Sequence, residues 1–406
     1  MTLPAPGDPR SIRYRYHFTD FRLGRLVSTL PMVGVQLSDV INGGASGSGT
    51  VPLSRQVIKR DPFAATITRR SICWAERQVI DAGQVAGSTF PWAGVVMKRT
   101  RAYAGRAMKL DMITLPGYMQ RRLLLDHTFT QVDKFTIFRT LVSDAATQPT
   151  AGVYMAGSPH LAPLIPTAGP LSGILADRTY LASDLKPTLE ALTALGNSGG
   201  AGFDWRFVPY LGTAGDLTTL AWRLDLGSPR LGRIAPPDLR WSTDRADRRQ
   251  RWGFVTDLTV VEDGSAVNNR TTAVGSGTGP DQLRSTVNGV DVGRDEIASG
   301  YVLYEGSTGG ASNDDRTIDT VRGKALGSLA AGFASEVQVS GIKVRGDLHP
   351  TLDSYMPGDD LTIRVGDAIT AQPMTIIGQL VGRTITPPER GGTEQVTLDI
   401  QGTVAA

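Results

Sequence analysis

Apolar and polar residues alternate along the chain between Tyr14 and Leu53. A period of two places every second side chain on the same face of a β-strand, so it indicates extended structure. A polar turn at residues 19–22 separates the first strand from the next, and a Gly/Ser-rich loop begins at Asn42. The residues that carry the alternation are Tyr14, Tyr16 and Phe18, then Val33, Val35 and Leu37. The chain is therefore expected to open as an antiparallel sheet.

Further strands are predicted over residues 65–76, 93–99 and 107–115, followed by a turn at Pro116. Short strands at this close spacing are typical of barrels and sandwiches. We expect residues 1–132 to form an N-terminal β-barrel domain.

The spacing of apolar residues changes to three or four after residue 132. It predicts one helix that begins near Asp133 and a second over residues 186–195, with Pro187 in its first turn and Gly196 as its stop. Strands are predicted over residues 204–209 and 218–226. Residues 133–238 are therefore expected to form an α+β middle domain, which ends in a Pro/Gly-rich segment.

The last block, residues 239–406, is again dominated by predicted strands and is expected to form a second β-barrel domain. Residues 253–262 and 269–274 are predicted to pair as a hairpin, and a helical insertion is predicted near 312–332. The other strands are predicted over 336–345, 360–365, 374–385 and 394–400. Residue-by-residue comparison detects no internal repeat. The predicted fold class is mainly β with α+β insertions.

Composition agrees with this fold class. The 406 residues include 47 Gly and 24 Pro, and 40% are hydrophobic, which suits a globular, turn-rich chain. The 42 basic and 39 acidic residues nearly balance, unlike a nucleic-acid-binding tail. A single cysteine, Cys73, excludes an intramolecular disulfide and a multi-cysteine zinc site. Neither a secretion signal nor a bilayer-spanning run is present, so we expect assembly in a cytoplasm.

Motifs for chemistry are weak. Residues 196–200 fit the G-x-S-x-G pattern around Ser198, but a nucleophile elbow requires a strand before the serine and a helix after it, and here the predicted order is reversed. His127 would have to serve as the base. The histidines lack the short spacing of metal ligands. Asp359 and Asp360 fit a turn, and Asp319 with its acidic neighbours fits a helix start, with calcium binding as the weaker alternative. We predict no enzyme activity, no cofactor and no metal site.

One cluster mixes arginine with tryptophan, as interfaces with proteins or with nucleic acids do. Asp244 and Asp247 neutralise part of its charge, which favours a protein interface or a solvated face over nucleic acid. The cluster comprises Trp241, Arg245, Arg248, Arg249, Arg251 and Trp252.

The opening hairpin resembles the N-terminus of minor tail or tail-tip hub proteins of long-tailed actinobacterial phages. Their hairpin carries the pattern D-x-R-x-G-x-x-x-x-x-L-P before a Gly/Ser-rich loop. The residues here that match it are Asp20, Arg22, Gly24, Leu30 and Pro31, followed by residues 42–53. A P-G-D-D run introduces a strand of the second barrel in such proteins, and residues 357–360 match it. The resemblance spans residues 14–400 by order of elements.

The resemblance implies a structural virion protein at the tail tip, with two barrels of the tail-hub type. Three copies would form a hub that joins a hexameric tail tube to a threefold tip and lines the DNA exit channel. It implies distal tail, tape-measure and tip fibre or spike proteins as partners, with DNA passing through without specific binding. Because a DNA-passing bore should not clasp phosphates, we expect the arginines on outer or subunit-facing surfaces.

Two alternatives remain. A receptor-binding or carbohydrate-binding tail protein would carry aromatic platforms on loops, whereas only 7% of the residues are aromatic, and most of these lie in predicted strands. A tail-associated cell-wall hydrolase would need a catalytic domain, for which the sequence after the last predicted strand leaves little room.

Overall fold

The computed structural model describes residues 11–21, 24–81, 83–102, 104–147, 169–197, 202–213, 215–234, 239–243, 253–262, 264–277, 281–308, 317–335, 337–366, 374–389 and 392–405. Contacts between residues divide the chain into two compact units. The first unit comprises Met1–Asp257, Ile342–Gln401 and Ala405–Ala406, and the second comprises Leu258–Gly341 and Gly402–Val404. The division into domains 1–132, 133–238 and 239–406 therefore stays a prediction.

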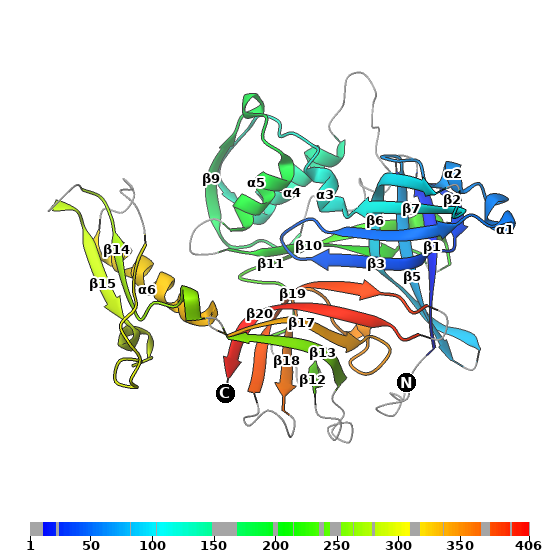
Figure 1. Cartoon of the computed structure of the whole chain (residues 1–406). Helices are drawn as coiled ribbons and strands as arrows, with labels where there is room; N and C mark the ends of the chain where they lie inside the picture. The colour runs from blue at the N-terminus through cyan, green and yellow to red at the C-terminus, as the bar shows by residue number, and fades with distance from the viewer. Residues whose placement is uncertain are drawn as a thin grey trace. The chain divides into compact units, whose positions relative to one another are not determined.

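The first barrel is built from the N-terminal strands (Figure 1). They are β1 (Ser11–Asp20), β2 (Leu26–Leu30), β3 (Val33–Val40), β4 (Ser46–Pro52), β5 (Ser71–Asp81), β6 (Gln84–Ala102) and β7 (Ala107–Ile113). They lie in the order β3-β4-β7-β6-β5-β1-β2. Only Pro31 and Met32 separate β2 from β3, so one bent strand joins the two ends of the sheet. Two short helices, α1 (Arg55–Ile58) and α2 (Pro62–Ala65), connect β4 to β5.

Trp92 fixes the packing inside this barrel. Its ring lies so close to Gly47 on β4 that a Cβ atom there would approach the ring to 2.6 Å. Its indole N–H donates to the carbonyl of Ser38 on β3 at 2.8 Å. One side chain from β6 therefore bridges two other strands, and Gly47 is required to leave room for it.

The second barrel comprises β12 (Arg240–Ser242), β13 (Gly253–Glu262), β17 (Val337–Arg345), β18 (Asp360–Val365), β19 (Met374–Thr386) and β20 (Gln395–Ala405). These strands lie in the order β18-β12-β13-β17-β20-β19, and pairing between β18 and β19 closes the ring. The predicted fold class, mainly β with α+β insertions and two barrel-like domains, is confirmed.

The two barrels share one topology. When the bent strand β2–β3 is counted once, each barrel arranges its strands in the order first, second, third, sixth, fifth, fourth along the chain. Their first strands differ in direction, because β12 runs parallel to both neighbours whereas β1 is antiparallel to both of its own. The repeat that sequence comparison did not detect is thus present as a common order of strands.

A small α+β layer packs on the first barrel. It contains α3 (Leu115–Met119), β8 (His127–Asp133), α4 (Lys134–Thr147), β9 (Leu175–Tyr180), α5 (Thr188–Gly196), β10 (Asp204–Leu211) and β11 (Leu220–Gly227). The rings of Trp74 on β5 and Trp222 on β11 lie 4.5 Å apart, and both side chains are buried. Phe138 of α4 packs on Trp205 in the same core. Both predicted helices of this block are confirmed.

The second unit is a three-stranded sheet with one helix. Its elements are β14 (Arg270–Val274), β15 (Arg284–Asn288), β16 (Glu305–Thr308) and α6 (Ile318–Ser335). Val321, Ala325 and Leu329, spaced four residues apart along α6, are buried against the apolar side chains of the sheet. Short 3₁₀ turns occur in both units, at Ala182–Asp184, Leu217–Thr219, Gly264–Ala266, Gly289–Val292 and Leu352–Ser354.

Two predictions of local structure are wrong. The hairpin expected between residues 253–262 and 269–274 does not form, because β13 belongs to the 13-stranded sheet and β14 pairs with β15 and β16. The strand expected over residues 65–76 begins only at Ser71, since Ala65 ends helix α2. Among the described residues, no helix is both long enough and apolar enough to cross a membrane.

Candidate functional site: the contacts that join the barrels

A backbone ladder joins the two barrels within one chain. Strand β3 of the first barrel pairs antiparallel with the end of β19 of the second, with Ser38 opposite Thr384 and Asp39 opposite Arg383. The hydroxyl oxygens of Ser38 and Thr384 are 2.9 Å apart, at hydrogen-bond distance. Both barrels are therefore parts of one continuous sheet of 13 strands (Figure 1).

Arg383 lies beneath this ladder with 4% of its surface exposed. One guanidinium nitrogen donates to the backbone carbonyls of Leu352 at 3.4 Å and Tyr355 at 2.8 Å. Another lies 3.8 Å from the carboxylate of Asp39. Burial raises the pKa of Asp39, and the charge of Arg383 opposes that rise.

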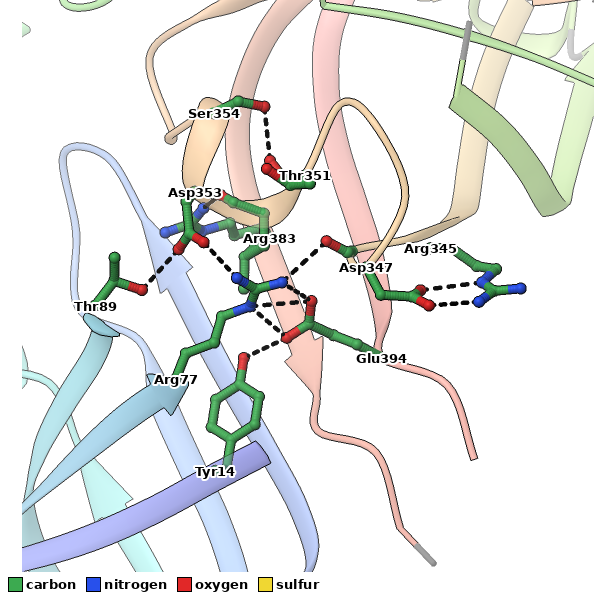
Figure 2. Close-up of polar contacts among 12 residues, drawn as sticks. Tyr14, Arg77, Thr89, Arg345, Asp347, Thr351, Asp353, Ser354, Arg383 and Glu394 are labelled. Carbon is green, nitrogen blue, oxygen red and sulfur yellow. Dashed lines mark hydrogen bonds and ion pairs between the residues drawn. The ribbon is translucent and has the colours of Figure 1, made fainter. Parts of the chain in front are cut away.

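A second contact joins the barrels without strand pairing (Figure 2). Arg77 of β5 donates to both carboxylate oxygens of Glu394, with the shortest distances at 2.8 Å, and Glu394 immediately precedes β20. Both side chains are almost completely buried, at 1% and 0% exposure. The same guanidinium is ion-paired with Asp353 and donates to the carbonyl of Gly346 at 3.2 Å.

The partners of this buried pair complete a network. The Tyr14 hydroxyl donates to Glu394 at 2.7 Å, and the Thr89 hydroxyl donates to Asp353 at 2.6 Å. Burial raises the pKa of the Tyr14 phenol well above its ordinary value, and the charge of Glu394 adds to that effect. Burial by itself would lower the pKa of Arg77, but the hydrogen bonds and charge of Glu394 outweigh it, and the pKa is raised. We name Tyr14, Arg77, Thr89, Asp353 and Glu394 the buried network after its buried centre, Arg77 and Glu394, while Thr89 and Asp353 lie at its exposed edge.

A cavity of about 780 Å³ lies beside this network, between strands of the first barrel, the β10–β11 hairpin and the turn at Leu352–Ser354. His17 and Glu76 form part of its wall, and their side chains are 2.9 Å apart. The Glu76 carboxylate also accepts hydrogen bonds from Gln78 and Ser88. Burial opposes ionisation of Glu76, but the bonds from His17, Ser88 and Gln78 outweigh it and lower its pKa from 4.5 to about 2. A carboxylate satisfied this fully within the protein is typical of a structural network.

Of the residues in the predicted arginine–tryptophan interface, only Trp241 belongs to the described part of the chain. Trp241 is fully buried and its ring packs edge-on against Tyr355, with centroids 5.2 Å apart, so it is a core residue. Arg245, Arg248, Arg249, Arg251 and Trp252 lie outside the described residues, and their role remains a prediction.

The weaker sequence leads are placed as follows. Ser198 lies outside the described residues, and His127 is paired with Asp144. Asp360 is held by two hydrogen bonds from Arg230 at 2.7 and 2.8 Å, and Asp359 is ion-paired with Arg233, as expected of structural residues after a turn. Within the part of the chain that the structure describes, no three or more His, Cys, Asp or Glu side chains gather as a metal site would require.

Sequence reasoning missed the residues that join the barrels. A charged residue inside an otherwise apolar strand is the signal that could have found them. Arg77 lies within the buried run of residues 71–78 in β5, and Arg383 interrupts the apolar pattern of β19. The sequence does not show which acidic residues face them, because Glu394 lies 317 positions from Arg77.

No protein-family model and no curated protein sequence matches the chain. Solved structures do match. The tail protein from Neisseria meningitidis has a TM-score of 0.52 at 14% identity, over 96% of both chains. The 43 kDa tail protein of prophage MuSo2 from Shewanella oneidensis has a TM-score of 0.52 at 8% identity, over 96% of this chain and 98% of that one.

A chain of the Francisella PdpA–VgrG complex gives a TM-score of 0.51 at 9% identity. The alignment covers 97% of this chain but only 58% of that chain. At these identities the likeness concerns the fold. The chain has the fold of these phage tail and VgrG-complex proteins.

Proposed function

We propose that the chain is a structural virion protein that forms the trimeric hub at a phage tail tip. In this role it joins the hexameric tail tube to the threefold tip and lines the channel through which DNA leaves. The likeness to two tail proteins over nearly their whole lengths supports a structural tail protein.

The observation that carries the hub is the pair of barrels with one strand order in a single chain. Three such chains supply six similar barrels, which is the number needed to match a sixfold tube. The assembly of three chains still has threefold symmetry and can match a threefold tip. A closed ring also covers strand edges that would otherwise remain open to aggregation.

The proposed partners are the distal tail, tape-measure and tip fibre or spike proteins of the same virion. DNA passes through the ring transiently, so we expect a neutral or acidic bore. A map of the assembled tip with arginines around the bore would contradict this part of the proposal.

Native mass spectrometry of the purified chain, together with copy counting in isolated tail tips, tests the hub. We expect three times the chain mass of 43.3 kDa. A single copy in both preparations would contradict the proposal. A structural hub needs no catalytic activity, so peptidoglycan cleavage by the purified protein would favour the hydrolase alternative.

A further inference from the structure

The shared topology of the barrels identifies equivalent strands. The ladder within the chain pairs the second strand of the first barrel, β3, with the fifth strand of the second barrel, β19. The corresponding second strand of the second barrel is β13, and the fifth strand of the first barrel is β6. Among the described strands, β13 pairs only with β12 and β17, and β6 only with β5 and β7.

The side chains of β6 and β19 match at the point of contact. Arg383 and Thr384 on β19 correspond to Arg99 and Thr100 on β6. Arg383 donates to carbonyls three residues apart in the connection between the third and fourth strands of its barrel. Arg99 does the same in its own barrel, since it donates to the carbonyls of Phe63 at 2.8 Å and Thr66 at 3.5 Å. The two arginines therefore occupy equivalent positions, and each bonds to backbone carbonyls in the equivalent connection of its own barrel.

The side chains of β3 and β13 match as well. Leu37, Ser38 and Asp39 on β3 correspond to Val255, Thr256 and Asp257 on β13, in the order apolar, hydroxyl, carboxylate. Leu37 and Val255 are both buried.

The two sets differ in what covers them. Arg383 is 4% exposed because β3 lies against it, whereas Arg99 is only half-buried and Thr100 is exposed. Ser38 and Asp39 are half-buried in the ladder, whereas Thr256 and Asp257 are exposed. The Asp257 carboxylate is bonded to Lys343 at 2.7 Å but remains 57% exposed.

We propose that β6 of one copy pairs antiparallel with β13 of a second copy, and so repeats the β3–β19 ladder between chains. Arg99 then faces Asp257, and Thr100 faces Thr256. The inference rests on the proposed trimeric hub and names the strands that close it. Six junctions would alternate around the ring, three within chains and three between them. The register departs from the internal ladder at one position, where Arg101 replaces Ile385.

Charge supports this choice of partner. The end of β6 carries Lys98, Arg99 and Arg101, while the facing part of β13 carries Asp257. Opposite charges across a head-to-tail contact favour association with the correct edge, and like charges would oppose pairing of β6 with another β6.

Disulfide trapping tests the pairing directly. Directly opposed residues of an antiparallel pair have Cα atoms about 4.5–5.5 Å apart, which suits a disulfide. The native Cys73 is fully buried, so it does not compete. One full-length chain carries Thr100→Cys and a differently tagged chain carries Thr256→Cys. After mixing and mild oxidation we expect a mixed disulfide dimer, and neither variant alone should form it. A wild-type trimer whose variants never cross-link would overturn the ladder while leaving the hub intact.

Charge reversal gives an independent measurement. Arg99→Asp and Asp257→Arg should each raise the protein concentration needed for trimer assembly about tenfold or more, and combining both changes in one chain should restore assembly. The control is Lys109→Asp on β7, an exposed basic residue outside the proposed register. Equal loss from the control, or no recovery in the double variant, would overturn the pairing. A wild-type chain that is monomeric both in solution and in tail tips would instead contradict the hub itself.

Discussion

Two buried arginines, Arg77 and Arg383, join the barrels through ionic contacts, and these contacts differ in how much the backbone supports them. Asp39 and Arg383 face each other across paired strands, and their charged atoms are 3.8 Å apart. Arg77 and Glu394 lie on β5 and just before β20, which are not neighbours in the sheet, and their bonds are as short as 2.8 Å. Where backbone hydrogen bonds hold two barrels together, the ion pair can be loose. Where no strands pair, side chains provide most of the contact, and the buried ion pair is close.

The largest effect is expected from Arg77→Met. The change leaves Glu394 buried without its cation, so the free energy of unfolding of the first unit should fall by about 3–5 kcal/mol. Urea unfolding followed by tryptophan fluorescence measures the loss. Replacing Glu394 with Met as well should recover much of it, because no buried charge remains. Lys109→Met is the matched control, since the side chains of Lys109 and its partner Asp111 are both exposed, at 61% and 40%, and the pair should contribute at most about 1 kcal/mol.

Gly346→Ala should have the next largest effect. A Cβ atom at this position would meet a Glu394 carboxylate oxygen at 2.4 Å. That carboxylate is held by Arg77 and Tyr14 and cannot move aside freely, so we expect a loss of about 1–3 kcal/mol. Gly87→Ala, in open space on β6, should change stability little. Similar urea midpoints for the two variants would show that the buried network is looser than its geometry indicates.

Arg383→Met tests the other side of the comparison. The carbonyls of Leu352 and Tyr355 lose a donor, but the β3–β19 ladder remains, so we expect a loss of about 1–2 kcal/mol. The loss should be clearly smaller than that of Arg77→Met in the same urea assay. A loss equal to or larger than that of Arg77→Met would contradict the comparison, because it would mean that the β3–β19 backbone hydrogen bonds contribute little to the stability of the contact.

Tyr14→Phe should have the smallest effect, about 0.5–1.5 kcal/mol, since one hydrogen bond to Glu394 is lost. Its pH dependence is more specific. The pKa of Tyr14 is raised on folding, so its contribution is present below the ordinary phenol pKa of 10.0 and is lost as pH rises above it. The variant should therefore lose less stability than the wild type as the pH rises above about 10. Burial also raises the pKa of Tyr16 and Tyr355, so part of the alkaline loss should persist. Identical alkaline profiles would place Tyr14 outside the buried network.

Most individual elements could be predicted from the sequence. The alternation around Tyr14 and Tyr16 became β1, and the helix expected near 312–332 became α6. Its residues Val321, Ala325 and Leu329 are buried, whereas Ile318 is 49% exposed. These patterns are reliable because they report which side of a local element is buried. The predicted hairpin between β13 and β14 is wrong because the sequence of a short strand does not specify which strand pairs with it. Strand β14 pairs instead with β15 and β16 in the second unit.

The candidate site was less predictable. The residues chosen from the sequence, led by Trp241, were selected for composition, and Trp241 is part of the core. Arg77 and Glu394 meet only because two barrels bring distant segments together. The repeat escaped sequence comparison because strand order can persist when only short matches, such as Arg99-Thr100 with Arg383-Thr384, remain in the residues.

The sequence alone thus determined a chain of strands with α+β insertions and two barrel-like domains, because burial patterns are local. Only the tertiary structure decided which strands close each barrel, which charges are buried between them, and which strands occupy the positions equivalent to β3 and β19. Those outcomes depend on contacts between residues that lie tens to hundreds of positions apart, and a local pattern carries no information about them.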